Sequence, residues 1–195
     1  VARALTEKGC TVTGIDGLPA AAVDGPEDYH QVSLGTEPLP VEASEYDFIL
    51  LLDVVEHLKR PEAFVDDLYD SLAEAPATEI IATTGNIAFG PIRVMLLLGM
   101  FNYGKRGILD LDHSRLFTLT SFRKIFEDRG FEVSEASGIP APYHLAVKTN
   151  WIASLLTVLN KAGIRLWKRF FSFQIMLHLK PRPSLTWLLA QAHLQ

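Results

Sequence analysis

The chain has 195 residues, of which 48% are hydrophobic, so it can bury the core of one folded domain. Its formal net charge of −5 argues against a nucleic-acid-binding surface, which is usually basic. The single cysteine, Cys10, excludes a disulfide framework and a cysteine-based zinc site, and no apolar run reaches the roughly 18 residues that cross a bilayer.

The first half of the sequence alternates between helical and extended patterns. A helix is predicted over residues 1–9, and residues 18–25 are typical of a turn or a short helix. A second helix begins at Pro61, because proline suits a first helical turn. The apolar residues that this helix would bury are Phe64, Leu68 and Leu72. Apolar or β-branched runs predict three strands, namely residues 10–16, 29–34 and 47–52. Residues 48–52 are continuously apolar, which predicts a central parallel strand buried on both faces.

The second half continues the alternation. Further strands are predicted at residues 78–84, 131–137 and 171–180, and helices at 120–130 and 150–170. The first of these helices places Phe122, Ile125 and Phe126 on one face. Residues 86–117 are a long apolar and aromatic segment, which we interpret as an insertion on the substrate side. The pattern predicts an α/β fold with a parallel sheet, in a single domain over residues 1–195.

Acidic residues follow two of the predicted strands. In an open parallel sheet, ligands bind beyond the carboxyl ends of the strands. Asp16 could accept hydrogen bonds from the hydroxyls of a ribose, or it could be a turn or helix-capping residue. Asp53 has the same capping alternative. His57 could act as a general base or be a solvated loop residue.

A second polar cluster lies in the segment "LDHSRLFT". His113 and Arg115 could belong to a substrate lid together with Tyr103, or they could simply tie a loop to its neighbouring acids. The sequence has no clustered cysteines and no paired histidines at metal-binding spacing, so we expect no metal site.

Three segments in this order resemble the class I S-adenosylmethionine-dependent methyltransferases, of types 11, 12 and 23. They are "VTGID", "YDFILLLDVVEHLKRPEAFVDDL" and "DHSRLFTLTSFRKIFEDRGFEV". The stretch "GNIAFGPIRVMLLLGMFNYGKRGILDLDHSRLFT" is similar to methyltransferases associated with glycosyltransferases of bacterial surface polysaccharides. The resemblance covers essentially the whole chain.

The resemblance implies a Rossmann-like, doubly wound, seven-stranded sheet whose last strand is antiparallel. The family's first strand and its Gly-rich loop have no counterpart in residues 1–195, so we expect a chain truncated at its N-terminus. That strand lies between strands two and four of the family, and its absence would leave two strand edges unpaired.

The resemblance also implies a site for S-adenosylmethionine. The residues it assigns to the cofactor are Asp16, Gly17, Leu18, Ser33, Leu34, Leu52 and Asp53. Ser33 stands where the family usually has an aspartate. His57 matches a histidine near the acceptor, and we expect it to be the base, oriented by Glu56. The residues expected on the acceptor side are Asn86, Tyr103, His113 and Arg115.

The expected function is O-methylation of a small-molecule, sugar or lipid-linked acceptor, with no nucleic-acid partner. Alternatives are a quinone-type O-methyltransferase and a non-catalytic remnant that lost cofactor binding. We expect a cytoplasmic protein, in peripheral contact with the inner membrane face through residues 93–101 and 151–171, which combine apolar and basic residues. These two segments could instead cover the sheet and the substrate pocket.

Overall fold

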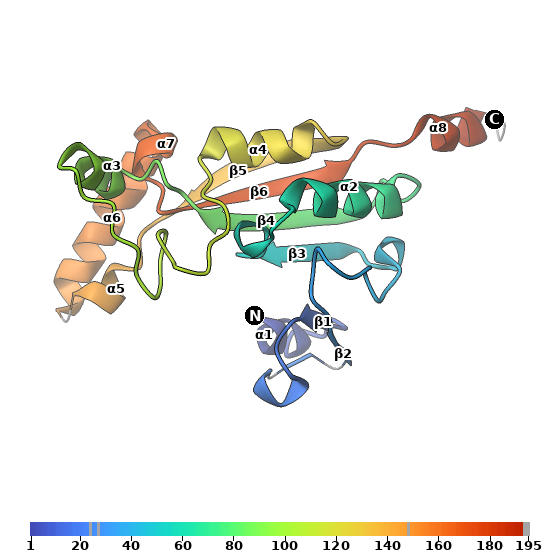
Figure 1. The fold of residues 1–195 in the computed structure, drawn as a ribbon, viewed down its shortest axis with the longest axis horizontal. Coiled ribbons are helices and arrows are strands. Elements are labelled where there is room, and N and C mark those ends of the chain that lie inside the picture. Colours follow the sequence, from blue (N-terminus) through green and yellow to red (C-terminus); the bar gives the residue numbers. More distant parts are fainter. Residues whose placement is uncertain (24, 27, 148, 193–195) are drawn as a thin grey trace. The chain divides into compact units, whose positions relative to one another are not determined.

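The computed structural model describes residues 1–23, 25–26, 28–147 and 149–192. The chain forms two compact units, Val1–Ala43 and Ser44–Gln195, which we describe one by one (Figure 1). The organisation of residues 1–195 as a single domain stays a prediction.

The first unit contains a short helix, two strands and a 3₁₀ turn. Helix α1 is Ala2–Thr6, β1 is Thr13–Asp16, the turn η1 is Ala20–Ala22 and β2 is Asp28–Gln31. Strands β1 and β2 are parallel, and Asp16 lies opposite Gln31 at their ends. Ala43 is the one buried residue among the described residues of this unit, so its core is shallow.

The second unit is built on a four-stranded mixed sheet in the order β3-β4-β6-β5. The strands are β3 (Phe48–Leu52), β4 (Glu79–Gly85), β5 (Phe131–Ile139) and β6 (Gln174–Pro181). β3 runs parallel to β4, whereas β6 is antiparallel to both of its neighbours. The predicted antiparallel last strand is therefore confirmed, within an α/β fold.

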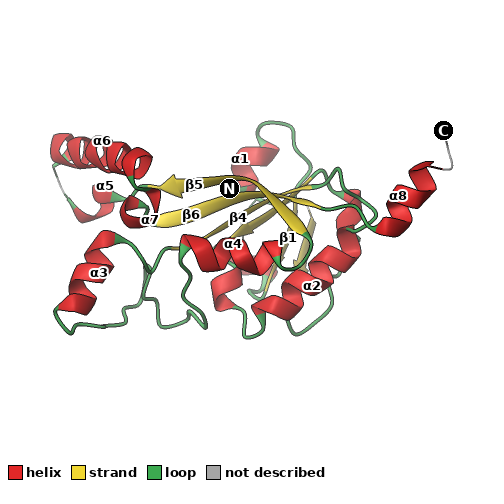
Figure 2. Cartoon of the chain, turned by 90° about the horizontal axis from the view of Figure 1, so that it is seen from above, coloured by secondary structure: helices red, strands yellow, loops and turns green. Residues whose placement is uncertain are grey.

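Two helices cover one face of this sheet. Figure 2 shows α2 (Pro61–Leu72) and α4 (Leu119–Glu127) on the same side of the strands. Alternate residues of β4 and β6 are buried beneath them, because successive side chains of a strand point to opposite faces. The helical residues predicted to face the core are all buried, namely Phe64, Leu68, Leu72, Phe122, Ile125 and Phe126.

The prediction that residues 48–52 are a central strand buried on both faces is wrong. Among the residues that the structure describes, β3 is an edge strand of the four-stranded sheet and pairs only with β4. Phe48 and Leu52 leave 56% and 37% of their surface exposed, whereas Leu51 is buried. The reason is that α2 and α4 cover the face to which Leu51 points, and Phe48 and Leu52 point to the opposite face.

The remaining helices extend beyond the two ends of the sheet. Helices α3 (Gly90–Leu97), α5 (Tyr143–Ala146), α6 (Asn150–Leu166) and α7 (Lys168–Phe171) lie beyond the end at which β4 finishes (Figures 1 and 2). Helix α8 (Leu185–Ala192) lies at the other end. Among the described residues, no helix combines the length and apolarity needed to cross a membrane.

Candidate functional site

The backbone turns sharply where β3 ends. Asp53 has a φ of 54°, in the left-handed region that side-chain-bearing residues rarely adopt. Its amide donates to the Thr83 hydroxyl at 3.0 Å, and the same hydroxyl donates to Asp53 Oδ1. Gln174 Nε2 donates to Asp53 Oδ2 at 2.7 Å. Asp53 thus ties together the ends of β3, β4 and β6, and these bonds compensate the cost of its conformation.

Glu56 is a buried carboxyl group in the 3₁₀ turn Val55–His57. Only 2% of its surface is exposed. Its Oε1 accepts a long hydrogen bond from the Gly85 amide, at 3.4 Å. Burial raises the pKa of Glu56 and the nearby Asp53 carboxylate adds to this, although the Thr84 hydroxyl and backbone amides oppose it. Even so, Glu56 Oε2 and Thr84 Oγ1 do not reach hydrogen-bonding geometry, and neither has another partner among the described residues.

His57 lies on the surface beside this buried acid. Its Nδ1 is 3.1 Å from the Asp112 carbonyl oxygen. A carbonyl can only accept, so Nδ1 donates this hydrogen bond, and in the neutral imidazole the lone pair is then on Nε2. The same reasoning applies to His113, whose Nδ1 is 3.0 Å from the Ile108 carbonyl oxygen. The two imidazoles meet edge to face, with ring centroids 4.8 Å apart.

Arg115 fastens the loop that carries His113. Its backbone amide donates to the Glu56 carbonyl at 3.0 Å, and its guanidinium pairs with Glu62 on α2. This hydrogen bond and charge hold the pKa of Glu62 below its usual range. The Ser114 hydroxyl also donates to the His57 carbonyl. The structure therefore brings together His57, His113 and Arg115, although they lie up to 58 positions apart in sequence.

Asn86 and Tyr103 are placed differently. Asn86 is fully buried, and its amide donates to the carbonyls of Arg169 and Ser172 and accepts from the Ala88 amide. It therefore ties the end of β4 to the chain around α7. Tyr103 is exposed and packs edge to face on Phe101. Contact of either residue with a substrate stays a prediction.

The expected cofactor residues of the first unit gather after β1 and β2. Asp16 is exposed, and its Oδ1 accepts from the Leu18 amide at 3.0 Å. The Tyr29 hydroxyl donates to the Leu18 carbonyl, and Gln31 Nε2 donates to the Gly17 carbonyl. Ser33, exposed, and Leu34, half-buried, follow β2 in a turn closed by hydrogen bonds to the Ser33 carbonyl. In the second unit, Leu52 is partly exposed beside Asp53.

Sequence reasoning missed the polar residues that position Asp53 and Glu56. Thr83, Thr84 and Gln174 have no motif around them, and Gln174 is 121 positions from Asp53. Only the strand register, which sets Thr84 opposite Ile175 and so places Gln174 at the same sheet edge, brings them there. Among the described residues, no group of three or more potential ligands could hold a metal ion.

The acidic turn after β3 and the polar cluster around His57 lie at the carboxyl end of β3, which is where ligands bind in open α/β sheets. A family model described as a methyltransferase domain matches residues 1–136, and the chain belongs to this family.

Named relatives agree with this assignment. The ubiquinone biosynthesis O-methyltransferase of Psychrobacter arcticus is 24% identical over 171 residues, which cover 81% of this chain. The chain spans 64% of the length of that curated relative.

Solved structures share the fold. A SAM-dependent methyltransferase from Archaeoglobus fulgidus superposes with a TM-score of 0.60 at 14% identity, over 91% of this chain and 79% of the other. The magnesium protoporphyrin IX methyltransferase of Synechocystis PCC 6803, solved with bound SAH, gives 0.53 at 14% identity, over 92% and 68%.

Proposed function

We propose that the protein transfers a methyl group from S-adenosylmethionine to a hydroxyl oxygen of a small acceptor. The observation that carries this proposal is the methyltransferase-domain match over residues 1–136. The cofactor supplies an already activated methyl group, so the protein has to position the acceptor and exclude water.

The resemblance assigns cofactor-binding residues within each unit. Asp16 would accept hydrogen bonds from the ribose hydroxyls, because it is exposed at the carboxyl end of β1, and Gly17 and Leu18 would contact the adenosine. Ser33 and Leu34 would contact the adenine, and Leu52 and Asp53 the methionine part. An exposed carboxylate with one oxygen already held by the Leu18 amide fits a ribose diol, since its orientation is fixed before binding.

His57 takes the acceptor proton through Nε2, which its hydrogen bond through Nδ1 leaves as the acceptor nitrogen. Glu56 would orient His57 through the turn that carries both residues, which the hydrogen bond from the Gly85 amide to Glu56 Oε1 anchors. His113, Arg115 and Tyr103 form the acceptor side, and Asn86 holds the strand end from which that side departs.

The acceptor we propose is a sugar or a lipid-linked molecule, as in methyltransferases associated with surface-polysaccharide glycosyltransferases. A quinone-type acceptor is the second candidate, and it is favoured by the similarity to the Psychrobacter arcticus enzyme. We also place the protein in the cytoplasm, in peripheral contact with the membrane.

We further propose the seven-stranded sheet that the resemblance implies. Among the described residues, β1 pairs with β2 alone, and β3 pairs with β4 alone.

Titration calorimetry of the full-length protein with S-adenosylmethionine tests the proposal, and binding in the micromolar range is expected. Failure to bind would leave the fold without the activity, as a non-catalytic remnant.

The base is tested separately by His57→Ala, with the exposed His144→Ala as the matched control. We expect the first change to lower methyl-transfer turnover roughly 10²- to 10⁴-fold without weakening cofactor binding, and the second to change neither. Turnover of His57→Ala near the wild-type rate would remove His57 from the mechanism.

A further inference from the structure

Helix α6 carries an apolar stripe on its exposed side. The stripe consists of Trp151, Leu155, Val158, Leu159 and Leu166, and each of these side chains leaves between 49% and 87% of its surface exposed. Their spacing of four, three, one and seven positions places them on one face of a helix. Trp167, directly after the helix, is also about half exposed, at 52%.

The opposite side of α6 is the side that packs on the protein. Ala153, Asn160 and Ile164 are buried there, and Asn160 donates to the Phe171 carbonyl and accepts from the Ala141 amide. The interpretation in which this segment only covers the sheet therefore accounts for one side of α6 and leaves the apolar stripe without a function.

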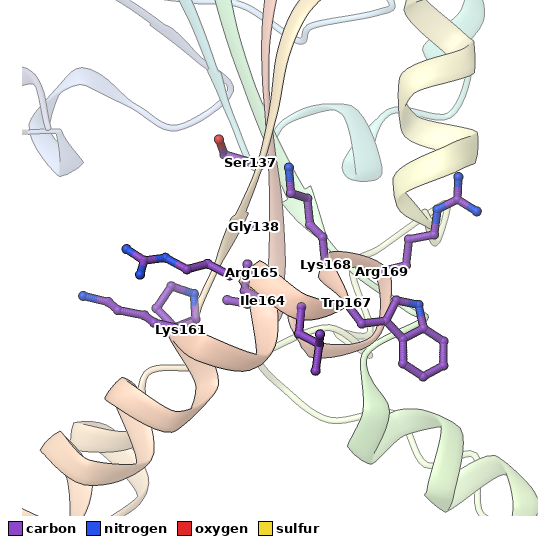
Figure 3. A pocket seen from close by; sticks show the side chains of 10 residues that line it. Ser137, Gly138, Lys161, Ile164, Arg165, Trp167, Lys168 and Arg169 are labelled. Atoms are coloured by element: carbon purple, nitrogen blue, oxygen red, sulfur yellow. The ribbon is translucent and has the colours of Figure 1, made fainter.

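Basic residues border the α6 stripe and line a cavity beside it. The cavity has a volume of about 870 Å³ and lies between β5 and α6-α7. Its polar lining includes Ser137, Lys161, Arg165, Lys168 and Arg169, and none of its described lining residues is acidic, although the Ser137 hydroxyl donates to Glu135 on the same strand. Figure 3 shows Lys161 and Arg165 extending side by side from α6, with Lys168 beside Ser137 on β5.

These basic side chains differ in the hydrogen bonds and ion pairs that they make within the protein. Lys168 Nζ donates to the Ala136 carbonyl, so it is partly committed to the fold. The side chains of Lys161, Arg165 and Arg169 have no hydrogen bond or ion pair with any described residue. The cavity therefore offers charge that the fold itself does not neutralise.

The distribution of charge along the chain also indicates that the region around the cavity is positively charged. Residues 1–135 contain 11 basic and 23 acidic residues, a net charge of −12. Residues 136–195 contain seven basic and no acidic residues. A chain with a formal net charge of −5 thus has a net positive charge in the segment that holds α6 and α7, although Lys180 in that segment pairs with Glu79.

We propose that α6 and α7 are a docking site for an anionic lipid bilayer. The α6 stripe enters the boundary between headgroups and acyl chains, and Lys161 and Arg165 bind lipid phosphates. Trp151 and Trp167 lie at the two ends of α6, where tryptophan suits the level of the headgroups. A second copy of the chain fits less well, because a symmetric contact through the stripe would bring its bordering cations against each other.

Co-sedimentation of the full-length protein with lipid vesicles tests this docking site. One set contains phosphatidylcholine alone, and the other contains about 30 mol% phosphatidylglycerol. We expect binding to the anionic vesicles only, weakened by salt because exposed charges are screened. Lys161→Gln with Arg165→Gln should lower partitioning roughly fivefold for each cation removed. Leu155→Ser with Leu166→Ser should lower it about tenfold or more.

The matched control is Arg123→Gln with Lys124→Gln on α4, which removes the same charge from an exposed helix outside the site. It should partition like the wild type. All substituted side chains are exposed, so unchanged circular dichroism is expected throughout. Equal losses in the control and the site variants would overturn the proposal. So would self-association that Leu155→Ser with Leu166→Ser abolishes in the absence of lipid, or saturation of the cavity by inorganic pyrophosphate or RNA with no vesicle binding.

Discussion

At the scale of single residues, the turn after β3 keeps an acid out of water. Glu56 is buried with one carboxylate oxygen unpartnered among the described residues, next to a histidine that is exposed. An ionised carboxylate in that position costs free energy, and protonation relieves the cost. The site therefore combines a carboxyl group that favours its neutral form with a histidine whose Nε2 is free to accept a proton.

This predicts how stability depends on pH. Because burial raises the pKa of folded Glu56, the folded state binds more protons than the unfolded state once the pH exceeds about 4.3, the ordinary value for glutamate. The contribution of Glu56 to the free energy of unfolding is then lost as the pH rises through the folded pKa. Glu56→Gln should remove this loss. In urea unfolding, the free energy of unfolding of the variant should therefore rise relative to that of the wild type between acidic and neutral pH.

Glu62→Gln provides a control of opposite sign. The pKa of Glu62 is lowered by Arg115, so its contribution is present at neutral pH and is lost as the pH falls. The free energy of unfolding of Glu62→Gln should therefore decrease relative to that of the wild type as the pH rises. The same pH trend in both variants would contradict the assigned directions.

The sequence anticipated part of this site and missed the rest for a physical reason. A strand followed by Asp-Val-Val-Glu-His marked Asp53, Glu56 and His57, because the carboxyl end of a parallel strand is where ligands bind. It did not show that Glu56 points inward while His57 points outward, since the direction of each side chain depends on how the 3₁₀ turn packs. The contact between His57 and the loop around His113 likewise needs the tertiary fold.

At the scale of elements, glycines end two helices under different constraints. Gly99 has a φ of +73°, and a Cβ there would meet nothing within 4 Å. Gly130 has a φ of +89°, and a Cβ there would lie 2.4 Å from Tyr69 Cε2. The Tyr69 ring cannot easily move, because it packs on Phe131 and its hydroxyl donates to the Arg182 carbonyl.

We therefore expect Gly99→Ala to cost about 1–2 kcal/mol, the cost of a left-handed conformation alone. Gly130→Ala should cost roughly 1–3 kcal/mol more, from overpacking against Tyr69. Chemical denaturation measures both, and in a Tyr69→Ala background most of the excess at Gly130 should disappear. Equal losses of stability in Gly99→Ala and Gly130→Ala would show that the Tyr69 ring moves to make room for the added methyl group.

Helices were predicted better than the environment of strands. The buried faces of α2 and α4 follow from helical spacing alone, because one apolar stripe can face only one core. For β3 the apolar run indicated a strand correctly, but an edge position and a central position demand different neighbours, and those neighbours are other segments of the chain.

At the scale of the whole molecule, the two units differ in how much core they contain. The second unit buries large side chains completely, among them Phe122, Phe126 and Phe131. The described part of the first unit buries only Ala43. Local opening is easier where few apolar contacts must be broken.

Hydrogen exchange of residues 1–195 should show this difference. Amides of β1 and β2 should exchange orders of magnitude faster than those paired between β4 and β6. Peptide-resolved mass spectrometry can follow both sheets in one experiment. Comparable protection in the two sheets would mean that the small unit gains stability from contacts outside its own core.

The outer edge of β3 also affects how readily molecules of residues 1–195 associate with one another in solution. A strand that pairs on one side presents a row of backbone donors and acceptors on the other, and β3 also displays the exposed ring of Phe48. Such an edge recruits strands from neighbouring molecules. At high protein concentration, we therefore expect residues 1–195 to associate through their edge strands, β3 among them.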